Sequence, residues 1–181
     1  MFNRVCIYCA ASPLIDSVYF KATEQLASLL VQKNIEVVFG GGSEGLMGKL
    51  ADTVLAKGGK IKGIMPQFMD DVEWGHKGVT DFEYTQTMHE RKSKFLIDID
   101  AIIALPGGTG TLEELLEVMT LKRLGKFKKP IVILNTNNYY EPLKLMLEKV
   151  VDEKFMHPRH MNLWDFVEHP DEVLSVLKLE V

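Results

Sequence analysis

The sequence predicts an α/β fold, a three-layer sandwich in which a mostly parallel sheet of about six or seven strands carries helices on both faces. Three observations lead to this prediction. Short apolar runs alternate with longer amphipathic segments along the chain, which is typical of strand–helix–strand units joined by right-handed crossovers. Several runs are apolar throughout, as expected of strands buried on both faces. Glycine-rich turns follow two of them and lead directly into a helix.

The first half of the chain supplies four expected strands and three expected helices. The strands are expected at residues 4–9, 35–39, 60–65 and 82–85, and the helices at residues 17–33, 46–57 and 88–98. Asp16 or Ser17 can cap the first helix, because a short side chain with an oxygen atom accepts the unpaired N–H groups of a helix start. Gly58 follows the second helix, as glycine commonly does. Residues 66–81 lack a clear period, so we expect a long connection there.

The second half continues the alternation. Strands are expected at residues 101–105, 131–134 and 163–167, and helices at residues 112–124, 139–151 and 170–177. No repeat, low-complexity segment or linker interrupts the pattern, and 181 residues are enough to bury a sizeable core. We therefore expect residues 1–181 to form a single domain.

Composition and charge exclude several classes of function. The chain is 46% hydrophobic and 25% charged, with a formal net charge of −4 and no block of lysine and arginine, so we expect no nucleic-acid partner. No apolar run is long enough to cross a bilayer, and the first residues show no signal-peptide pattern, so we expect no membrane partner and a cytoplasmic location. Small phosphorylated ligands remain compatible with this charge.

Cys6 and Cys9 form a Cys-x-x-Cys pair, a spacing that is redox-active or zinc-binding in some proteins. Both lie in the first expected strand, where residues three apart point to opposite faces. The five histidines show no spacing typical of a metal site. We therefore expect neither a redox centre nor a metal site.

The segment Pro106-Gly107-Gly108-Thr109-Gly110-Thr111-Leu112-Glu113-Glu114 joins an expected buried strand to an expected helix. Glycines let the backbone approach a ligand closely, and the free N–H groups at a helix start attract anions such as phosphate. Thr109 and Thr111 add hydroxyl groups to the same turn. The segment therefore predicts a phosphate-binding loop.

A second glycine-rich turn, residues 40–45, matches Gly-x-Gly-x-x-Gly between a strand and a helix, a pattern found in nicotinamide-cofactor sites. Such sites also need an acidic residue at the end of the next strand to hold the ribose. That strand ends at Met65 and Pro66, and Asp70 and Asp71 lie well beyond it. We therefore expect a tight strand-to-helix turn with some ribose or phosphate contact rather than a nicotinamide site.

Ligands of parallel sheets bind beyond the carboxyl ends of the strands. Three expected strand ends that meet this rule are residues 9–12, 40–48 and 106–114, and the helix start Met88-His89-Glu90-Arg91-Lys92 follows a fourth. Adjacent charges on a helix often mark only a solvated face. The guanidinium of Arg91, however, is planar and permanently charged, which suits an anionic or stacked ligand.

Glu113 and Glu114 need a role other than anion binding, because a carboxylate repels a phosphate. One of them can match the positive end of the helix, and Glu113 suffices for that role. Glu114 is then left to stabilise positive charge on a sugar whose glycosidic bond breaks, or to orient the attacking water. The residues alone therefore predict a nucleotide or sugar-phosphate site and leave its reaction open.

Taken together, residues 40–48, 88–92 and 106–114 resemble the LONELY GUY (LOG) family, whose signature is Pro-Gly-Gly-x-Gly-Thr-x-x-Glu and which is also labelled possible lysine decarboxylase. The likeness continues through residues 129–135 and 139–143. It implies a Rossmann-like homodimer acting as a cytokinin riboside 5′-monophosphate phosphoribohydrolase. Such an enzyme hydrolyses the N-glycosidic bond of AMP or N6-modified AMP to the free base and ribose 5-phosphate. We expect no cofactor.

The resemblance also implies site residues. Arg91 and Glu114 match the catalytic pair. The positions expected to bind the substrate or its phosphate are Gly107, Gly108, Thr109, Gly110, Thr111, Lys92, Met88 and Glu90, to which the strand ends add Gly41, Gly42 and Ser12. The chain departs from the family pattern at residues 9–12, at Thr109 and at residues 121–123. These departures leave open which base the substrate carries and which oligomer forms.

Two other functions are alternatives to hydrolysis. Decarboxylation with pyridoxal phosphate needs a Schiff-base lysine, and neither the phosphate loop nor Glu114 calls for one. A non-catalytic nucleotide-binding module is the alternative that we retain. The presence of both Arg91 and Glu114 stands against it, because binding alone does not require the carboxylate.

Overall fold

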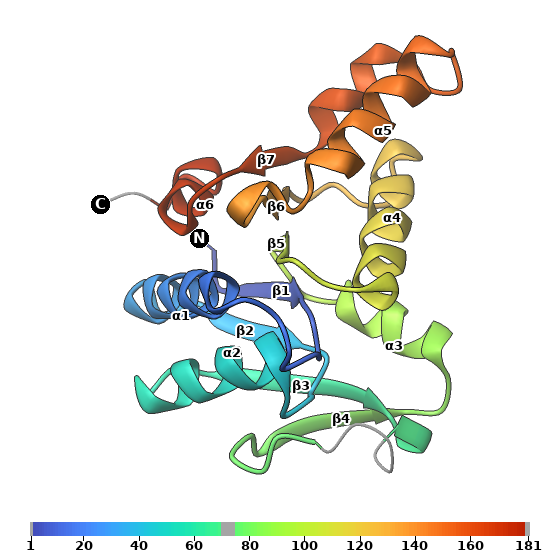
Figure 1. The fold of residues 1–181 in the computed structure, drawn as a ribbon. Helices are drawn as coiled ribbons and strands as arrows, with labels where there is room; N and C mark the ends of the chain where they lie inside the picture. The colour runs from blue at the N-terminus through green and yellow to red at the C-terminus, as the bar shows by residue number, and fades with distance from the viewer. Residues whose placement is uncertain (1, 70–74, 180–181) are drawn as a thin grey trace.

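The computed structural model describes residues 2–69 and 75–179. Strands and helices alternate along the chain as expected (Figure 1). The strands are β1 (Arg4–Tyr8), β2 (Glu36–Phe39), β3 (Ile61–Pro66), β4 (Asp81–Thr85), β5 (Ala101–Ala104), β6 (Ile131–Leu134) and β7 (Asp165–Val167). The α-helices are α1 (Ser17–Gln32), α2 (Gly45–Ala56), α3 (Met88–Phe95), α4 (Thr109–Arg123), α5 (Glu141–Asp152) and α6 (Pro170–Val176).

The seven strands form one parallel sheet in the order β4-β3-β2-β1-β5-β6-β7. In Figure 1 this order runs from β4 at the bottom to β7 at the top. The predicted sheet of about six or seven mostly parallel strands is confirmed.

Helices cover both faces of the sheet. One buried cluster joins α1, α2 and α6 to the sheet, and a second joins α3, α4 and α5 to the other face. Along β1 the side chains alternate between the two clusters, Val5 and Ile7 on one side and Cys6 and Tyr8 on the other. Cys9 lies in the cluster opposite to Cys6, so the two cysteines point to opposite faces as predicted. The three-layer α/β sandwich is thus confirmed.

Element boundaries fall close to the expected ones, with local differences. Asp16 is the N-cap of α1, and its Oδ1 accepts the N–H of Val18 at 2.9 Å. In the connection after β3, residues 67–69 form a 3₁₀ turn and Gly75 pairs with Gly42 in an isolated antiparallel bridge. Asp70 and Asp71, the nearest acidic residues after the third expected strand, lie outside the described residues.

Two broader expectations are not tested by the fold. No helix in the described ranges combines the length and the apolar character that a membrane span requires. The cytoplasmic location and the single-domain organisation of residues 1–181 stay predictions.

Candidate functional site

The strand order places a topological switch point between β1 and β5. On one side of this pair lie β2, β3 and β4, and on the other lie β6 and β7. The helices that follow β1 and β5 cover opposite faces, so a crevice opens at the carboxyl ends of the two strands, where ligands of open α/β sheets bind. A cavity of about 310 Å³ lies there, lined by residues 7–12, Gly40, Met47, Arg91, residues 108–111 and Glu114.

The loop after β5 forms one wall of this cavity. The carbonyl groups of residues 105–107 each accept a hydrogen bond, and the donors are, in order, the Tyr140 hydroxyl at 2.7 Å, the Ala10 N–H at 3.1 Å and the Tyr139 hydroxyl at 2.6 Å. Gly108 follows as the N-cap of α4 and offers no side chain to the first N–H groups of the helix. Those groups are therefore suited to an anion, as the sequence predicts.

Sequence reasoning missed the roles of Tyr139 and Tyr140. Asn135, at the end of β6, anchors their segment, because its Oδ1 accepts the Tyr140 N–H at 2.6 Å and its Nδ2 donates to Glu168 at 3.0 Å. Two adjacent tyrosines after a buried strand, on the ligand side of the sheet, were the sequence feature that could have indicated these roles. In the sequence analysis they serve only as part of the resemblance to the family.

Arg91 reaches the cavity from α3 with a side chain that is only 7% exposed. Its Nε donates to the carbonyl oxygen of Ile64 at 3.1 Å, and its Nη2 donates to that of Gly40 at 3.1 Å. The Phe95 ring centre lies 5.1 Å from the guanidinium carbon, a cation–π distance. Two carbonyl groups and one ring therefore fix the guanidinium at the carboxyl end of the sheet.

Glu114, on the second turn of α4, faces Arg91. The Nη1 atom of Arg91 lies 3.8 Å from the Oε1 atom of Glu114, and the Glu114 side chain is 12% exposed. Burial, and then the negative charge of Glu114, raise the pKa of the Cys6 thiol well above its ordinary value, so this neighbour stays neutral. The predicted catalytic pair thus combines a permanent cation and a carboxylate at one buried position.

Glu113 does not take the helix-start role that the sequence suggested. Because α4 begins at Thr109, Glu113 lies in the second turn, and the first turn has no acidic residue. Glu113 and Glu117 instead form ion pairs with Lys92 of α3, and the Lys92 Nζ lies 3.1 Å from the Glu117 Oε2. The hydrogen bond to Glu113 raises the pKa of Lys92. The prediction was wrong because the helix includes residues 109–111, which we had assigned to the loop.

The other predicted positions on α3 lie at its first turn. Thr87 is the N-cap and accepts the N–H of Glu90 at 3.0 Å, while the Glu90 carboxylate accepts the N–H of Gln86 at 2.9 Å. Met88 is 37% exposed. Neither these residues nor Lys92 is among the described residues that line the cavity. Their contact with a substrate stays a prediction.

The second glycine-rich turn packs α2 against the loop after β1. In the first turn of α2, the N–H groups of Leu46 and Met47 donate to the carbonyl oxygen of Ala10 at 2.9 and 3.2 Å. Gly45 has a φ of +59°, and an added Cβ would lie 2.5 Å from the carbonyl carbon of Ala11, so this close approach requires glycine. These N–H groups are already bonded within the protein, which agrees with the expectation of a packing turn rather than a pyrophosphate site.

The remaining predicted positions lie in or beside the cavity. Ser12 lines it, and the second glycine-rich turn contributes Gly40 to the described lining. Gly41 follows Gly40 in the chain, and its carbonyl oxygen accepts the N–H of His76 at 2.9 Å. The predicted ribose or phosphate contacts of Gly41 and Gly42 stay predictions.

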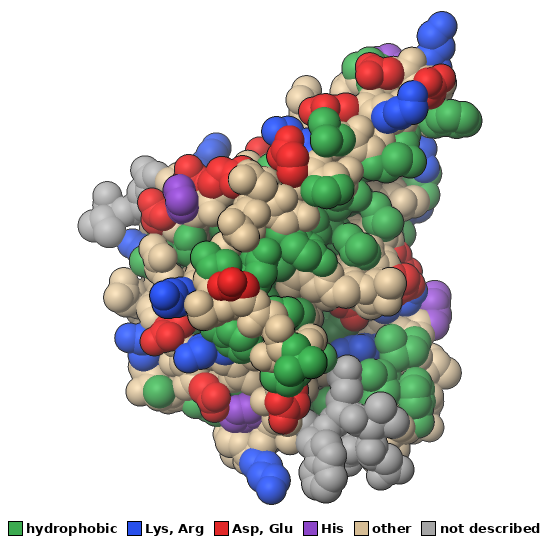
Figure 2. Space-filling view, viewed as in Figure 1, with side chains coloured by type: hydrophobic (Ala, Val, Ile, Leu, Met, Phe, Trp, Pro, Cys, Tyr) green, Lys and Arg blue, Asp and Glu red, His purple; other side chains and the backbone are tan. Residues whose placement is uncertain are grey.

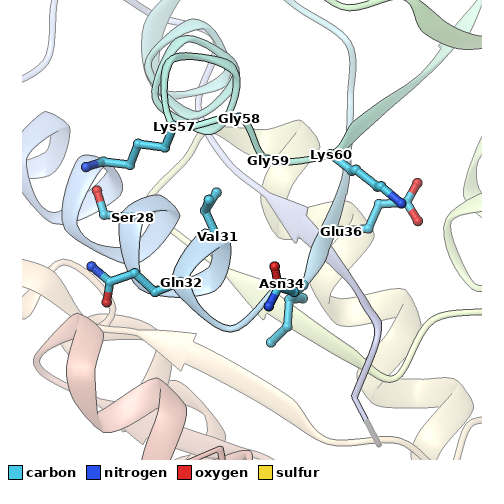
Figure 3. Close-up of a pocket in the computed structure, with 10 residues that line it drawn as sticks. Ser28, Val31, Gln32, Asn34, Glu36, Lys57, Gly58, Gly59 and Lys60 are labelled. Carbon is cyan, nitrogen blue, oxygen red and sulfur yellow. The ribbon is translucent and has the colours of Figure 1, made fainter.

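A larger cavity, of about 590 Å³, lies where α1 and α2 end and β2 and β3 begin (Figure 3). Helix C-termini carry partial negative charge, which opposes phosphate. Lys57 and Lys60 on its rim point away from each other in Figure 3, so they do not form a joint cationic site. The smaller cavity at the switch point is therefore the candidate site.

A parallel sheet with a glycine-rich loop that leads into a helix at its switch point is typical of Rossmann-like proteins, many of which bind nucleotides at this place. A family model described as possible lysine decarboxylase matches residues 47–177. Two cytokinin riboside 5′-monophosphate phosphoribohydrolases of Arabidopsis thaliana are similar in sequence. LOG2 is 41% identical over 155 residues, covering 86% of this chain and 73% of LOG2. LOG5 is 40% identical over 179 residues, covering 99% of this chain and 78% of LOG5. The chain belongs to the LOG family, as the motifs predicted.

The fold is also similar to that of a solved structure, the molybdenum cofactor binding protein from the phototrophic bacterium Rippkaea orientalis. The TM-score is 0.73 at 18% identity, and the likeness covers 98% of this chain and 96% of that chain. At this identity the likeness concerns the fold alone. It agrees with the predicted Rossmann-like architecture.

Proposed function

We propose that this protein is a nucleoside 5′-monophosphate phosphoribohydrolase. It hydrolyses the N-glycosidic bond of AMP or of an N6-modified AMP, a cytokinin nucleotide, and releases the free base and ribose 5-phosphate. The observation that carries the proposal is the buried pair of Arg91 and Glu114 beside the glycine-rich loop. The activity named for the LOG relatives at about 40% identity supports it.

The phosphate of the substrate binds at the start of α4. Gly108, Thr109, Gly110 and Thr111 all line the cavity, and the positive end of a helix of 15 residues lies at this point. Backbone N–H groups and a helix dipole together stabilise a bound phosphate. This arrangement holds the 5′-phosphate at one end of the cavity and leaves the sugar near Glu114.

Arg91 and Glu114 act on the two products of bond cleavage. As the bond from the anomeric carbon to the base nitrogen breaks, the base leaves with the electron pair and positive charge builds on the ribose. The Glu114 carboxylate stabilises that charge or accepts a proton from the attacking water, whose oxygen forms the new bond to the anomeric carbon. Arg91 contacts the nucleotide and stabilises the negative charge on the base before it takes up a proton.

Lysine decarboxylation is disfavoured because the described lining of the cavity offers no lysine for a Schiff base. A Schiff base to a cofactor forms from a lysine that has lost its proton. None of the described residues that line the cavity is a lysine, and the neighbouring Lys92 has a pKa raised by its hydrogen bond to Glu113. Lys92 therefore remains an ion-paired ammonium group.

The proposal includes a homodimer, with α4 and α5 at the interface. Leu116 of α4, Leu124 directly after α4, and Leu145 and Met146 of α5 are exposed. Figure 2 shows hydrophobic side chains along the projecting region of α5 at the upper right. Exposed apolar side chains of this size favour a protein contact. Light scattering should give twice the chain mass of 20.5 kDa, and a mass of one chain would exclude the dimer.

The test uses purified protein with AMP and with isopentenyladenosine monophosphate, followed by chromatography for free base and ribose 5-phosphate. Adjacent carboxylates provide a matched pair of variants. We expect Glu114→Gln to lower kcat by about 100-fold or more, and Glu113→Gln, which alters only a partly exposed ion pair, to stay within about threefold of the wild type. Nucleotide binding without release of base from either substrate would instead indicate the non-catalytic module.

A further inference from the structure

The hydroxyl group of Tyr139 donates to the carbonyl oxygen of Gly107 at 2.6 Å. We infer that this contact makes Tyr139 a positioning residue for the phosphate loop, which sets the orientation of the Gly107–Gly108 peptide group. The inference rests on the proposed function for the identity of the ligand, a phosphorylated sugar. Tyr139 is not among the described residues that line the cavity, so the inference assigns an effect on phosphate affinity to a residue outside that lining.

The geometry of the peptide group connects this contact to the cavity. In a trans peptide the C=O and the following N–H point in opposite directions, and the described residues contain no cis peptide. When Tyr139 draws the Gly107 carbonyl toward α5, the N–H of Gly108 must therefore point the other way. Gly108 lines the cavity and caps α4, so this N–H belongs to the anion-binding end of the helix.

The peptide needs such a contact because it joins two glycines. Without Cβ atoms, little steric hindrance opposes rotation of the peptide plane. The preceding carbonyl groups, those of Leu105 and Pro106, are held by other donors. The Gly107 carbonyl is the last of the three and depends on Tyr139.

The Tyr139 ring is itself held in place. It lies edge-on against Tyr140, with ring centres 5.1 Å apart, and against Tyr19 of α1, with ring centres 6.0 Å apart. Tyr140 is anchored by its hydroxyl to Leu105 and by its N–H to Asn135. Ring contacts of this kind do not involve the hydroxyl group, so Tyr139→Phe removes the hydrogen bond and keeps the packing.

The experiment measures binding of ribose 5-phosphate by titration calorimetry and turnover of AMP in wild type, Tyr139→Phe and a control, Tyr84→Phe. Tyr84 is 45% exposed on β4, at the opposite edge of the sheet from β6 and β7. In Tyr139→Phe, we expect the Kd for ribose 5-phosphate and the KM for AMP to rise by about tenfold, with kcat within about threefold, as the loss of one hydrogen bond predicts. The control should match the wild type.

A merely structural role would lower thermal stability and kcat together and leave the Kd for ribose 5-phosphate unchanged. That result, or wild-type affinity in Tyr139→Phe, would overturn the inference. If the wild type binds ribose 5-phosphate but releases no base from AMP, the proposed function fails, while the binding data still decide the role of Tyr139. A wild type that does not bind ribose 5-phosphate would overturn both.

Discussion

The guanidinium of Arg91 occupies the space that a side chain at Gly40 would need. Its Nη2 donates to the Gly40 carbonyl at 3.1 Å, and a Cβ added to Gly40 would lie 2.5 Å from that nitrogen and 2.9 Å from the Met47 sulfur. The first glycine of the second glycine-rich turn is therefore needed for its small size. It lets the cation approach the backbone at the end of β2.

Replacing Gly40 with alanine should displace Arg91 from this position. The methyl group cannot share the space with Nη2, so the guanidinium must leave its place beside Gly40 and its geometry relative to Glu114 must change. We expect kcat/KM for AMP to fall by at least about tenfold, because misplaced catalytic groups lose much of their effect. Steady-state kinetics measures this, and circular dichroism checks the fold. Kinetics equal to those of the wild type would show that the site tolerates the displacement.

Gly110→Ala should affect ligand binding without harming the fold. Apart from its chain neighbours and the backbone of its own helix, a Cβ at Gly110 meets no described atom within 4 Å. Alanine is also favoured over glycine in a helix by up to about 1 kcal/mol. Since Gly110 lines the cavity, we expect unchanged or higher thermal stability together with weaker binding of ribose 5-phosphate. A thermal melt and a titration on the same preparation test both parts. Unchanged affinity would place the phosphate elsewhere.

Tyr140→Phe should act mainly on stability. Tyr140 is 1% exposed, and its hydroxyl donates to the Leu105 carbonyl at 2.7 Å. Burial raises the pKa of Tyr140 well above its ordinary value, so the phenol remains a donor. Removing it leaves a buried carbonyl unpaired, which costs about 1–3 kcal/mol. Urea denaturation should show this loss in Tyr140→Phe and not in Tyr84→Phe; equal midpoints would mean that another donor satisfies Leu105.

Asp100 should make stability depend on pH in the acid range. Its Oδ2 accepts the N–H groups of Asn3 and Arg4 at 2.8 and 3.2 Å, which ties the start of β1 to that of β5. Burial alone raises the pKa of this carboxyl group, but these N–H groups and Lys129 outweigh it and lower the pKa overall. A lowered folded-state pKa means that the stabilisation is complete above the unfolded value of about 3.9 and is lost as pH falls through the folded value.

The corresponding measurement compares urea midpoints of the wild type and Asp100→Asn between pH 7 and pH 3. We expect the variant to be less stable at neutral pH, and the difference to disappear as pH falls below about 4. A difference that stays constant over this range would show that the ionised carboxylate contributes nothing beyond the neutral group.

Local sequence patterns predicted most helices and strands, and they predicted the glycine-rich loop that forms one wall of the cavity. The start of α4 was misplaced because Gly108 and Gly110 read as loop residues, and glycine disfavours helix. Glu113 consequently received the wrong role. Tyr139 and Tyr140 were missed because their loop partners lie 32 and 35 residues away in the chain, and no periodic pattern records a contact over that distance.

The α/β class, the glycine-rich turn after β5 and the motifs of the LOG family are all readable in the amino-acid sequence, because periodicity, turn chemistry and motif spacing are properties of neighbouring residues. Only the tertiary structure decided that β1 and β5 are adjacent. That adjacency decided that Arg91 lies between Gly40 and Glu114, and the pairing of β5 with β6 decided that two tyrosines hold the loop. Strand neighbours depend on how whole layers bury their apolar faces, and no short stretch of the chain encodes that choice.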